Sequence, residues 1–158
     1  MGNDKTISTS HIPLQPDYVR DWILAVTKPA NFLLIDDDPH DRELFARFSR
    51  GWNCKFDLAS NMEEAKKFIA LKSYRLVFLD IKFPGYSGVD VFKELKAINP
   101  KVKVAFLSGY ISNETVQQTQ SLGLTIFIAK PQAFTDEFFS SLYNMLNVTK
   151  LPANDKTT

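Results

Sequence analysis

Residues 32–39 read Phe32-Leu33-Leu34-Ile35-Asp36-Asp37-Asp38-Pro39. Four consecutive apolar residues are typical of a strand buried on both faces of a sheet, and here three carboxylates follow directly. Three later runs, apolar except for Lys103, are also followed by a polar residue: Leu76–Leu79 by Asp80, Val102–Leu107 by Ser108, and Ile126–Ala129 by Lys130. Segments of helical length separate the runs, which predicts alternating strands and helices and therefore an α/β fold.

The polar residues at the ends of these runs are expected to meet. In an open parallel sheet, the carboxyl ends of the strands share one edge, and ligands bind there. We therefore expect Asp36, Asp37, Asp80, Ser108 and Lys130 to lie close together. Carboxylates are ligands for Mg²⁺, and an aspartate can accept a phosphoryl group as an acyl phosphate. A hydroxyl and an ammonium can hold phosphoryl oxygens. The pattern predicts a divalent-cation site beside a nucleophilic carboxylate.

These segments resemble the receiver domain of two-component response regulators, from Phe32 to about Asn147. The matching segments are Ile35–Pro39, Leu79–Gly88, Leu107–Tyr110 and Phe127–Pro131. The resemblance implies a flavodoxin-like, doubly wound parallel sheet of five strands in the order 2-1-3-4-5.

The resemblance also implies the roles of the acids. Asp80 is the expected phosphoacceptor, and a histidine kinase or histidine phosphotransfer protein is the expected donor. Mg²⁺ or Mn²⁺ is the expected cofactor. Asp37 would bind it directly, Asp36 largely through water, and the backbone carbonyl of Lys82 would complete the protein's share, together with Asp80.

In the family, the remaining site residues couple phosphorylation to an output surface. Lys130 and Ser108 would contact the phosphoryl group, and Phe127 matches the aromatic switch position. A plain core role for Phe127 is the alternative. The output surface would comprise the fourth helix, fifth strand and fifth helix. It would bind an unknown downstream protein and can also form a homodimer.

Three local features are predicted from the residues themselves. Asp38 before Pro39 is expected to be a helix N-cap. Ser60 and Glu63 have the spacing of a capping box at the start of the second helix. The last helix is expected at Phe134–Leu146, with an apolar side formed by Phe138, Leu142, Met145 and Leu146.

Composition limits the classes of protein that fit. The chain has 158 residues, of which 44% are hydrophobic, as expected of one globular domain. Its 19 basic and 18 acidic residues give no support for nucleic-acid binding. Cys54 is the single cysteine and is expected to be a small buried residue. No run approaches the ~18 apolar residues of a membrane span, and no secretory signal is apparent. The cytoplasm is the expected location.

The predicted organisation has three parts. Residues 1–28 form an N-terminal extension with a disordered start and a short amphipathic helix at about 16–26. We expect this helix to pack on the receiver, and partner binding is the alternative. The receiver domain spans 29–148, and 149–158 form a polar tail that leaves no room for an output domain.

The leading function is a single-domain response regulator phosphorylated on Asp80, which signals through protein–protein interaction. Two alternatives keep the fold: a phosphorylation-independent interaction module, and an intermediate carrier in a phosphorelay. An enzyme of the haloacid dehalogenase class also uses a strand-end aspartate, but it needs a second acid two residues later, where Lys82 stands. We therefore expect a phosphoacceptor domain and not an enzyme.

Overall fold

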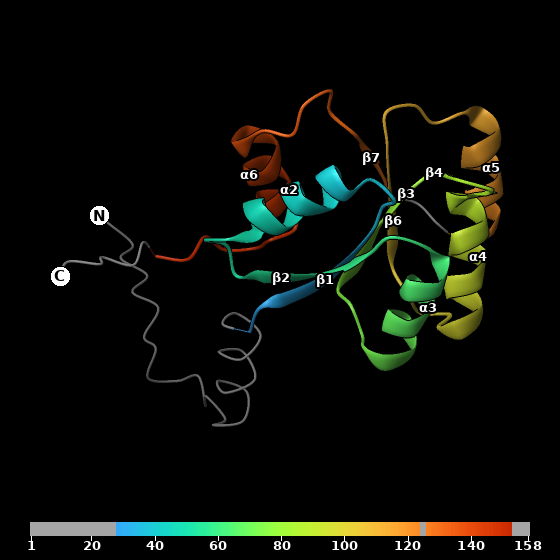
Figure 1. Cartoon of the computed structure of the whole chain (residues 1–158), viewed down its shortest axis with the longest axis horizontal. Coiled ribbons are helices and arrows are strands. Elements are labelled where there is room, and N and C mark those ends of the chain that lie inside the picture. The colour runs from blue at the N-terminus through green and yellow to red at the C-terminus, as the bar shows by residue number, and fades with distance from the viewer. Residues whose placement is uncertain (1–27, 124–125, 153–158) are drawn as a thin grey trace, which may run out of the picture.

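The computed structural model describes residues 28–123 and 126–152. Five strands form a parallel sheet: β1 (Ala30–Ile35), β2 (Cys54–Ala59), β3 (Leu76–Asp80), β6 (Val104–Ser108) and β7 (Ile126–Ala129). Their order is β2-β1-β3-β6-β7 (Figure 1). This confirms the predicted order 2-1-3-4-5, in which the fourth and fifth strands are β6 and β7. The predicted helix at 16–26 and the last residues of the predicted tail, 153–158, lie outside the described residues.

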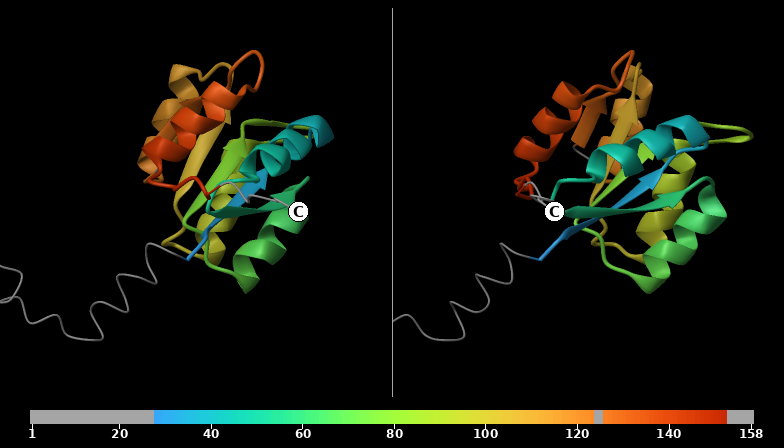
Figure 2. Two further views of the ribbon diagram at one scale, coloured as in Figure 1. Left: turned by 90° about the vertical axis from the view of Figure 1, so that its left-hand side faces the viewer. Right: turned by 60° about the vertical axis from the view of Figure 1, so that its left-hand side comes forward.

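Helices cover both faces of the sheet (Figures 1 and 2). On one face lie α2 (Pro39–Ser49) and α6 (Asp136–Met145). On the other lie α3 (Met62–Leu71), α4 (Gly88–Ile98) and α5 (Asn113–Ser121). The central strands β1, β3 and β6 are therefore covered twice, which explains why their apolar runs do not alternate with polar residues.

Side chains of the central strands alternate between two cores. In β1, Phe32 and Leu34 pack with residues of α2 and α6, whereas Leu33 and Ile35 pack with residues of α3 and α4. All four are fully buried. Burial of a single side chain of this size stabilises a fold by roughly 1.5–3 kcal/mol. The two cores together fix β1 and β3 in the centre of the sheet, and with them the position of the acids that follow.

The helix starts show one prediction confirmed and one wrong. The Asp38 carboxylate accepts a hydrogen bond from the backbone N–H of His40 at 2.9 Å and caps α2, as predicted. The cap of α3 is Asn61, not Ser60. Its side-chain oxygen accepts a hydrogen bond from the Glu64 N–H at 2.9 Å. The Ser60 hydroxyl instead donates to the Glu64 carboxylate. Both neighbours are good capping residues, so the motif alone placed the helix start one residue early.

The apolar side of the last helix matches the predicted one in part: Leu142 is buried, and Phe138 and Leu146 pack partly buried against the same core. Its buried residues are Phe139, Leu142 and Tyr143, while Met145 is 64% exposed. The sequence carries apolar residues at adjacent positions along this helix, so two overlapping apolar sides fit the helical period. Packing against the strands and α2 selects the side that contains Phe139.

The loop after Asp80 forms a small hairpin. β4 (Lys82–Phe83) pairs antiparallel with β5 (Tyr86–Ser87), and Gly85 adopts a φ of 81° in the turn between them. This backbone region favours glycine, because other side chains are strained there. Ser87 then begins α4 with a capping box to Asp90. The hairpin thus connects the strand end at Asp80 tightly to the first turn of α4.

The chain after α6 returns to the body of the domain. The N–H of Asn53 donates to the carbonyl of Thr149 at 2.8 Å, and the N–H of Leu151 donates to the carbonyl of Gly51 at 2.7 Å. Cys54 is buried beside this segment, and burial raises the pKa of its thiol to about 11. Across residues 28–123 and 126–152, the structure contains no helix with the length and hydropathy of a membrane span.

Candidate functional site

The register of the sheet brings the predicted site residues to one edge. Ile35 pairs with Leu79, Asp80 pairs with Leu107, and Ser108 pairs with Ala129. The four strands therefore end at nearly the same level, and the polar residues that follow them converge. Because β1, β3 and β6 each pair with a neighbour on both sides, and β7 pairs with β6, the hydrogen bonds of the sheet fix this convergence.

Three acids form the centre of the site. One carboxylate oxygen from each of Asp36, Asp37 and Asp80 lies within 4.8 Å of the others. Asp36 is fully buried, Asp37 is exposed, and Asp80 is half-buried. Burial, reinforced by the charge of Asp80, raises the pKa of Asp36 to about 7, although a hydrogen bond from the Asp38 N–H opposes the shift. A divalent cation would relieve this repulsion, so the donor set fits a hard, oxygen-binding ion such as Mg²⁺.

The two carboxylate oxygens of Asp80 have different partners. Oδ1 accepts a hydrogen bond from the Ile81 N–H at 2.7 Å, and the Lys82 N–H lies 3.4 Å away. Oδ2 faces the Lys130 ammonium at 3.4 Å. The side chain is 15% exposed. The backbone therefore fixes the orientation of the carboxylate, while part of it stays within reach of a ligand from solvent. The predicted role of the Lys82 carbonyl stays a prediction.

Lys130 lies among three carboxylates. Its Nζ is 3.3 Å from Oδ2 of Asp36, 3.4 Å from Oδ2 of Asp80 and 2.5 Å from Oδ2 of Asp41. Burial lowers the pKa of the ammonium, but the hydrogen bond with Asp41 and the charges of Asp36 and Asp80 outweigh it and raise the pKa above its ordinary value. Lys130 is therefore charged and can hold anionic oxygens at this edge.

Sequence reasoning missed Asp41. It belongs to no motif, and an acid in the first turn of a helix is common because the helix dipole favours it. Its position three residues after the N-cap Asp38 is the one available signal. This spacing places Asp41 close to the end of β1, where the other acids are. Its side chain is 11% exposed.

Ser108 and Phe127 lie near the site but are directed elsewhere. The Ser108 hydroxyl donates to the carbonyl of Tyr110 at 2.8 Å, within its own loop. The Phe127 ring is half-buried and stacks on Phe106, with ring centroids 6.2 Å apart. A switch that uses these two side chains therefore requires Ser108 to exchange its bond with Tyr110 for a new partner.

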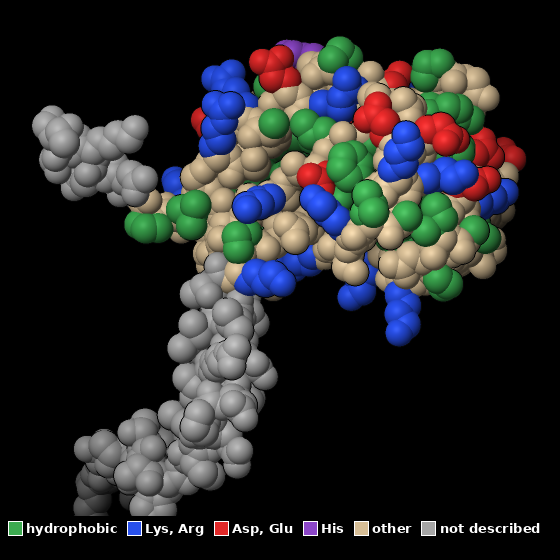
Figure 3. All heavy atoms as spheres, turned by 60° about the horizontal axis from the view of Figure 1, so that its bottom comes forward, with side chains coloured by type: hydrophobic (Ala, Val, Ile, Leu, Met, Phe, Trp, Pro, Cys, Tyr) green, Lys and Arg blue, Asp and Glu red, His purple; other side chains and the backbone are tan. Residues whose placement is uncertain are grey.

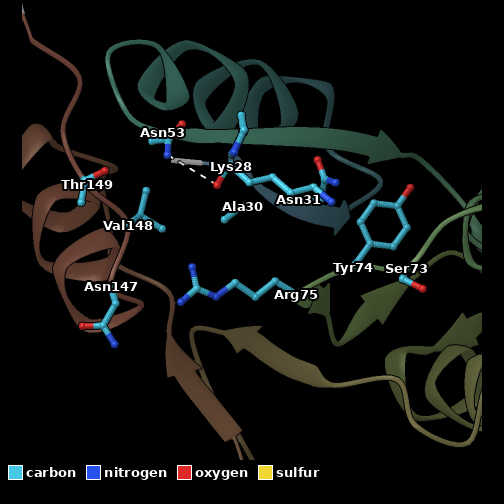
Figure 4. Close-up of a pocket in the computed structure, with 11 residues that line it drawn as sticks. Lys28, Ala30, Asn31, Asn53, Ser73, Tyr74, Arg75, Asn147, Val148 and Thr149 are labelled. Atoms are coloured by element: carbon cyan, nitrogen blue, oxygen red, sulfur yellow. Dashed lines mark hydrogen bonds between the residues drawn. The ribbon is translucent and has the colours of Figure 1, made fainter. Parts of the chain in front are cut away.

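A hollow of about 620 Å³ lies at the opposite edge of the sheet, where the strands begin (Figure 4). Arg75 and Lys28 contribute cations, and Asn31, Asn53 and Asn147 contribute amides. No carboxylate belongs to the described residues that line it. The hollow is thus separated from the acids by the length of the strands and forms no part of their site.

The sequence of the chain is similar to those of known proteins. The response regulator receiver domain family model matches residues 32–138. The transcriptional regulatory protein ZraR of Klebsiella oxytoca is 28% identical over 127 residues, which cover 80% of this chain and 28% of that protein. Sporulation initiation phosphotransferase F of Bacillus subtilis (strain 168) is 27% identical over 99 residues, which cover 63% of this chain and 80% of that protein.

A solved structure supports the same assignment. It is the response regulator protein TrrA from Thermotoga maritima in complex with Mg²⁺-BeF. It is 30% identical to this chain and has a TM-score of 0.57, and the match covers 73% of this chain and 98% of that one. The family match spans more than half of the sequence and includes the ends of all the strands that carry the acids, Ser108 and Lys130. The chain therefore belongs to the family of response regulator receiver domains of two-component systems.

Proposed function

We propose that this chain is a phosphoacceptor that takes a phosphoryl group on Asp80 from a histidine kinase or histidine phosphotransfer protein and signals by binding another protein. One observation carries the proposal: Asp80 presents a backbone-oriented carboxylate that lies beside Asp36 and Asp37 and faces the Lys130 ammonium at 3.4 Å. This places a nucleophile, a site for a divalent cation and a fixed positive charge within one small volume.

The chemistry follows from these positions. An oxygen of Asp80 attacks the phosphorus of the donor, an acyl phosphate forms, and the donor nitrogen leaves. Phosphoryl transfer needs little covalent help from the protein and depends on position and charge. A bound Mg²⁺ supplies neutralisation of the phosphoryl charge. Lys130, already 3.4 Å from Asp80, stabilises a phosphoryl oxygen, and Ser108 contributes a hydroxyl after leaving Tyr110.

The comparisons bear on two parts of the proposal: the identity of the cation and the presence of an attached output domain. TrrA was crystallised with Mg²⁺-BeF, which is consistent with Mg²⁺ as the cofactor of Asp36, Asp37 and Asp80 here. The chain spans 28% of the length of ZraR, whereas its match covers 80% of sporulation initiation phosphotransferase F. The second relative supports action without an attached output domain, and its name favours a phosphorelay carrier as the second candidate function.

The output surface that we propose comprises α5, β7 and α6. Apolar side chains are exposed on it at Leu122, Ile126 and Met145. Phe127 in β7 stacks on Phe106 in β6 and so joins this surface to the strands that carry the site. A downstream protein or a second copy of the chain would bind here.

The proposal is tested by incubating the purified chain with Mg²⁺ and acetyl phosphate and measuring the intact mass. A mass gain of one phosphoryl group that requires Mg²⁺ is the expected result. A phosphorylation-independent interaction module gives no gain. Transfer of the label onward to a histidine phosphotransfer protein distinguishes a relay carrier from a terminal regulator.

Loss of either cation-binding acid should weaken Mg²⁺ binding. We expect Asp37→Ala to weaken it by at least about tenfold and Asp36→Ala less, since outer-shell groups alone typically change metal affinity by 10–100-fold. Titration calorimetry with Mg²⁺ measures the three affinities. Glu94→Ala, which removes an exposed acid of α4 that pairs with Lys66 outside the site, serves as the control. Equal affinities in all the proteins would show that the cation binds elsewhere.

A further inference from the structure

The Asp41 carboxylate makes the shortest contact of Lys130. Its Oδ2 lies 2.5 Å from Nζ, compared with 3.3 Å for Asp36 and 3.4 Å for Asp80. Asp41 is buried in the first turn of α2. Within the part of the chain that the structure describes, Lys130 is its one ion-pair partner. The ammonium is therefore held most closely from the side of α2, and less closely by the acids at the ends of β1 and β3.

The single ammonium of Lys130 is shared among the carboxylates of Asp36, Asp41 and Asp80. An ammonium has three N–H donors and can satisfy at most three strong hydrogen bonds. The bond to Asp41 is short, whereas the distances to Asp36 and Asp80 are those of weak contacts. The more strongly Asp41 attracts the Lys130 ammonium, the less the ammonium competes with a divalent cation for the oxygens of Asp36 and Asp80.

We propose that Asp41 is a positioning residue that draws the Lys130 ammonium toward α2 and so leaves carboxylate oxygens of Asp36 and Asp80 available to a divalent cation. The inference rests on the proposed function of the same site, because it assigns to Asp41 the control of cation binding there. Without Asp41, the ammonium moves onto Asp36 and Asp80, and an incoming cation must displace it.

Titration of the full chain with Mg²⁺ alone tests this inference in a double-mutant cycle. The proteins are the unchanged chain, Asp41→Asn, Lys130→Ala and the double variant. We expect Asp41→Asn to weaken Mg²⁺ binding by about fivefold, within the range for residues of one ion-pair network. Lys130→Ala should tighten binding, because the competing ammonium is gone. In the Lys130→Ala background, Asp41→Asn should have a clearly smaller effect.

The cycle separates a positioning role from a simple charge effect. If Asp41 acts only as a nearby negative charge, its removal weakens binding at least as much when Lys130 is alanine, since no ammonium then screens it. That result, or an unchanged affinity in Asp41→Asn, overturns the inference. Asp57→Asn is the matched control: it breaks the 2.9 Å ion pair with Lys72, outside the site, and should leave the affinity unchanged.

The test does not depend on phosphorylation. An unchanged chain that binds Mg²⁺ but gains no phosphoryl mass overturns the proposed function and leaves the cycle interpretable. An unchanged chain that fails to bind Mg²⁺ overturns the positioning role of Asp41 as well. Melting temperatures of all the proteins, measured without Mg²⁺, show whether a variant has lost its fold. If Asp41→Asn has lost it, Asp41→Glu replaces it, and its Mg²⁺ affinity should stay within a few-fold of that of the unchanged chain. A loss of affinity as large as that expected of Asp41→Asn would contradict the inference.

Discussion

We expect Asp80→Asn to abolish the phosphoryl mass gain that is predicted for the unchanged protein with Mg²⁺ and acetyl phosphate. The amide has the shape of the carboxylate, and its oxygen can still accept the hydrogen bond from the Ile81 N–H. It is, however, a poor nucleophile, and it removes the charge that faces Lys130 at 3.4 Å. The fold should persist, because β3 and its neighbours are held by the buried apolar residues of both cores. Intact-mass measurement and a thermal melt check the two parts.

A matched control makes this result specific to the position. Asp57→Asn is the same chemical change on a neighbouring part of the sheet, in β2, and should keep the full mass gain. If Asp80→Asn is labelled as strongly as the unchanged chain, the phosphoacceptor is another residue. Peptide mapping would then show whether Asp37, the most exposed of the three clustered acids, carries the group.

The fold could be predicted because each of the apolar runs that form β1, β3, β6 and β7 is directly followed by a polar residue of the site. The apolar run at Phe32–Ile35 has no polar alternation, so it required cover on both faces, and the structure provides it. Parallel register then forces the residues after β1, β3, β6 and β7 to one edge. The convergence of Asp36, Asp80 and Lys130 is thus a geometric consequence of the strand order.

The parts that could not be predicted depend on side-chain direction. Whether Ser60 or Asn61 caps α3 is decided by a difference of one residue between two good capping groups. Whether Met145 or Tyr143 faces inward is decided by packing against α2 and the strands. Local patterns determine that a helix forms, but its rotation is fixed by contacts far away in the sequence.

In the site, too, the sequence predicts which residues meet but not the direction of each side chain. Parallel strands predict that Lys130 meets Asp36 and Asp80, but not that its shortest contact is Asp41. Asp41 has the common appearance of a first-turn acid, and only the structure shows that it points to the strand ends. Similarly, the motif predicts that the Ser108 hydroxyl contacts the phosphoryl group, while in the structure this hydroxyl donates a hydrogen bond to the carbonyl of Tyr110.

Gly88→Ala should destabilise the protein and impair phosphorylation together. A Cβ at Gly88 would lie 2.8 Å from the Cα of Ile81, 2.9 Å from Cε1 of Phe106, and against the carbonyl oxygen of Asp80. The first and last of these neighbours are backbone atoms and cannot turn away. Overpacking of this kind typically costs 1–3 kcal/mol, so we expect a melting temperature lower by several degrees. The strain falls on Asp80, the proposed nucleophile.

The effect on phosphorylation follows from that location. The Gly88 N–H donates to the Ile81 carbonyl at 2.6 Å, so a shift of Gly88 moves the segment that orients Asp80 Oδ1. A displacement of about 1 Å at a reacting group can cost 100-fold in rate. Gly109→Ala is the control for stability, because no atom lies within 4 Å of its added Cβ, and its melting temperature should stay unchanged. If Gly88→Ala melts and reacts like the unchanged chain, the close packing of α4 against the Asp80 backbone is not what positions the nucleophile.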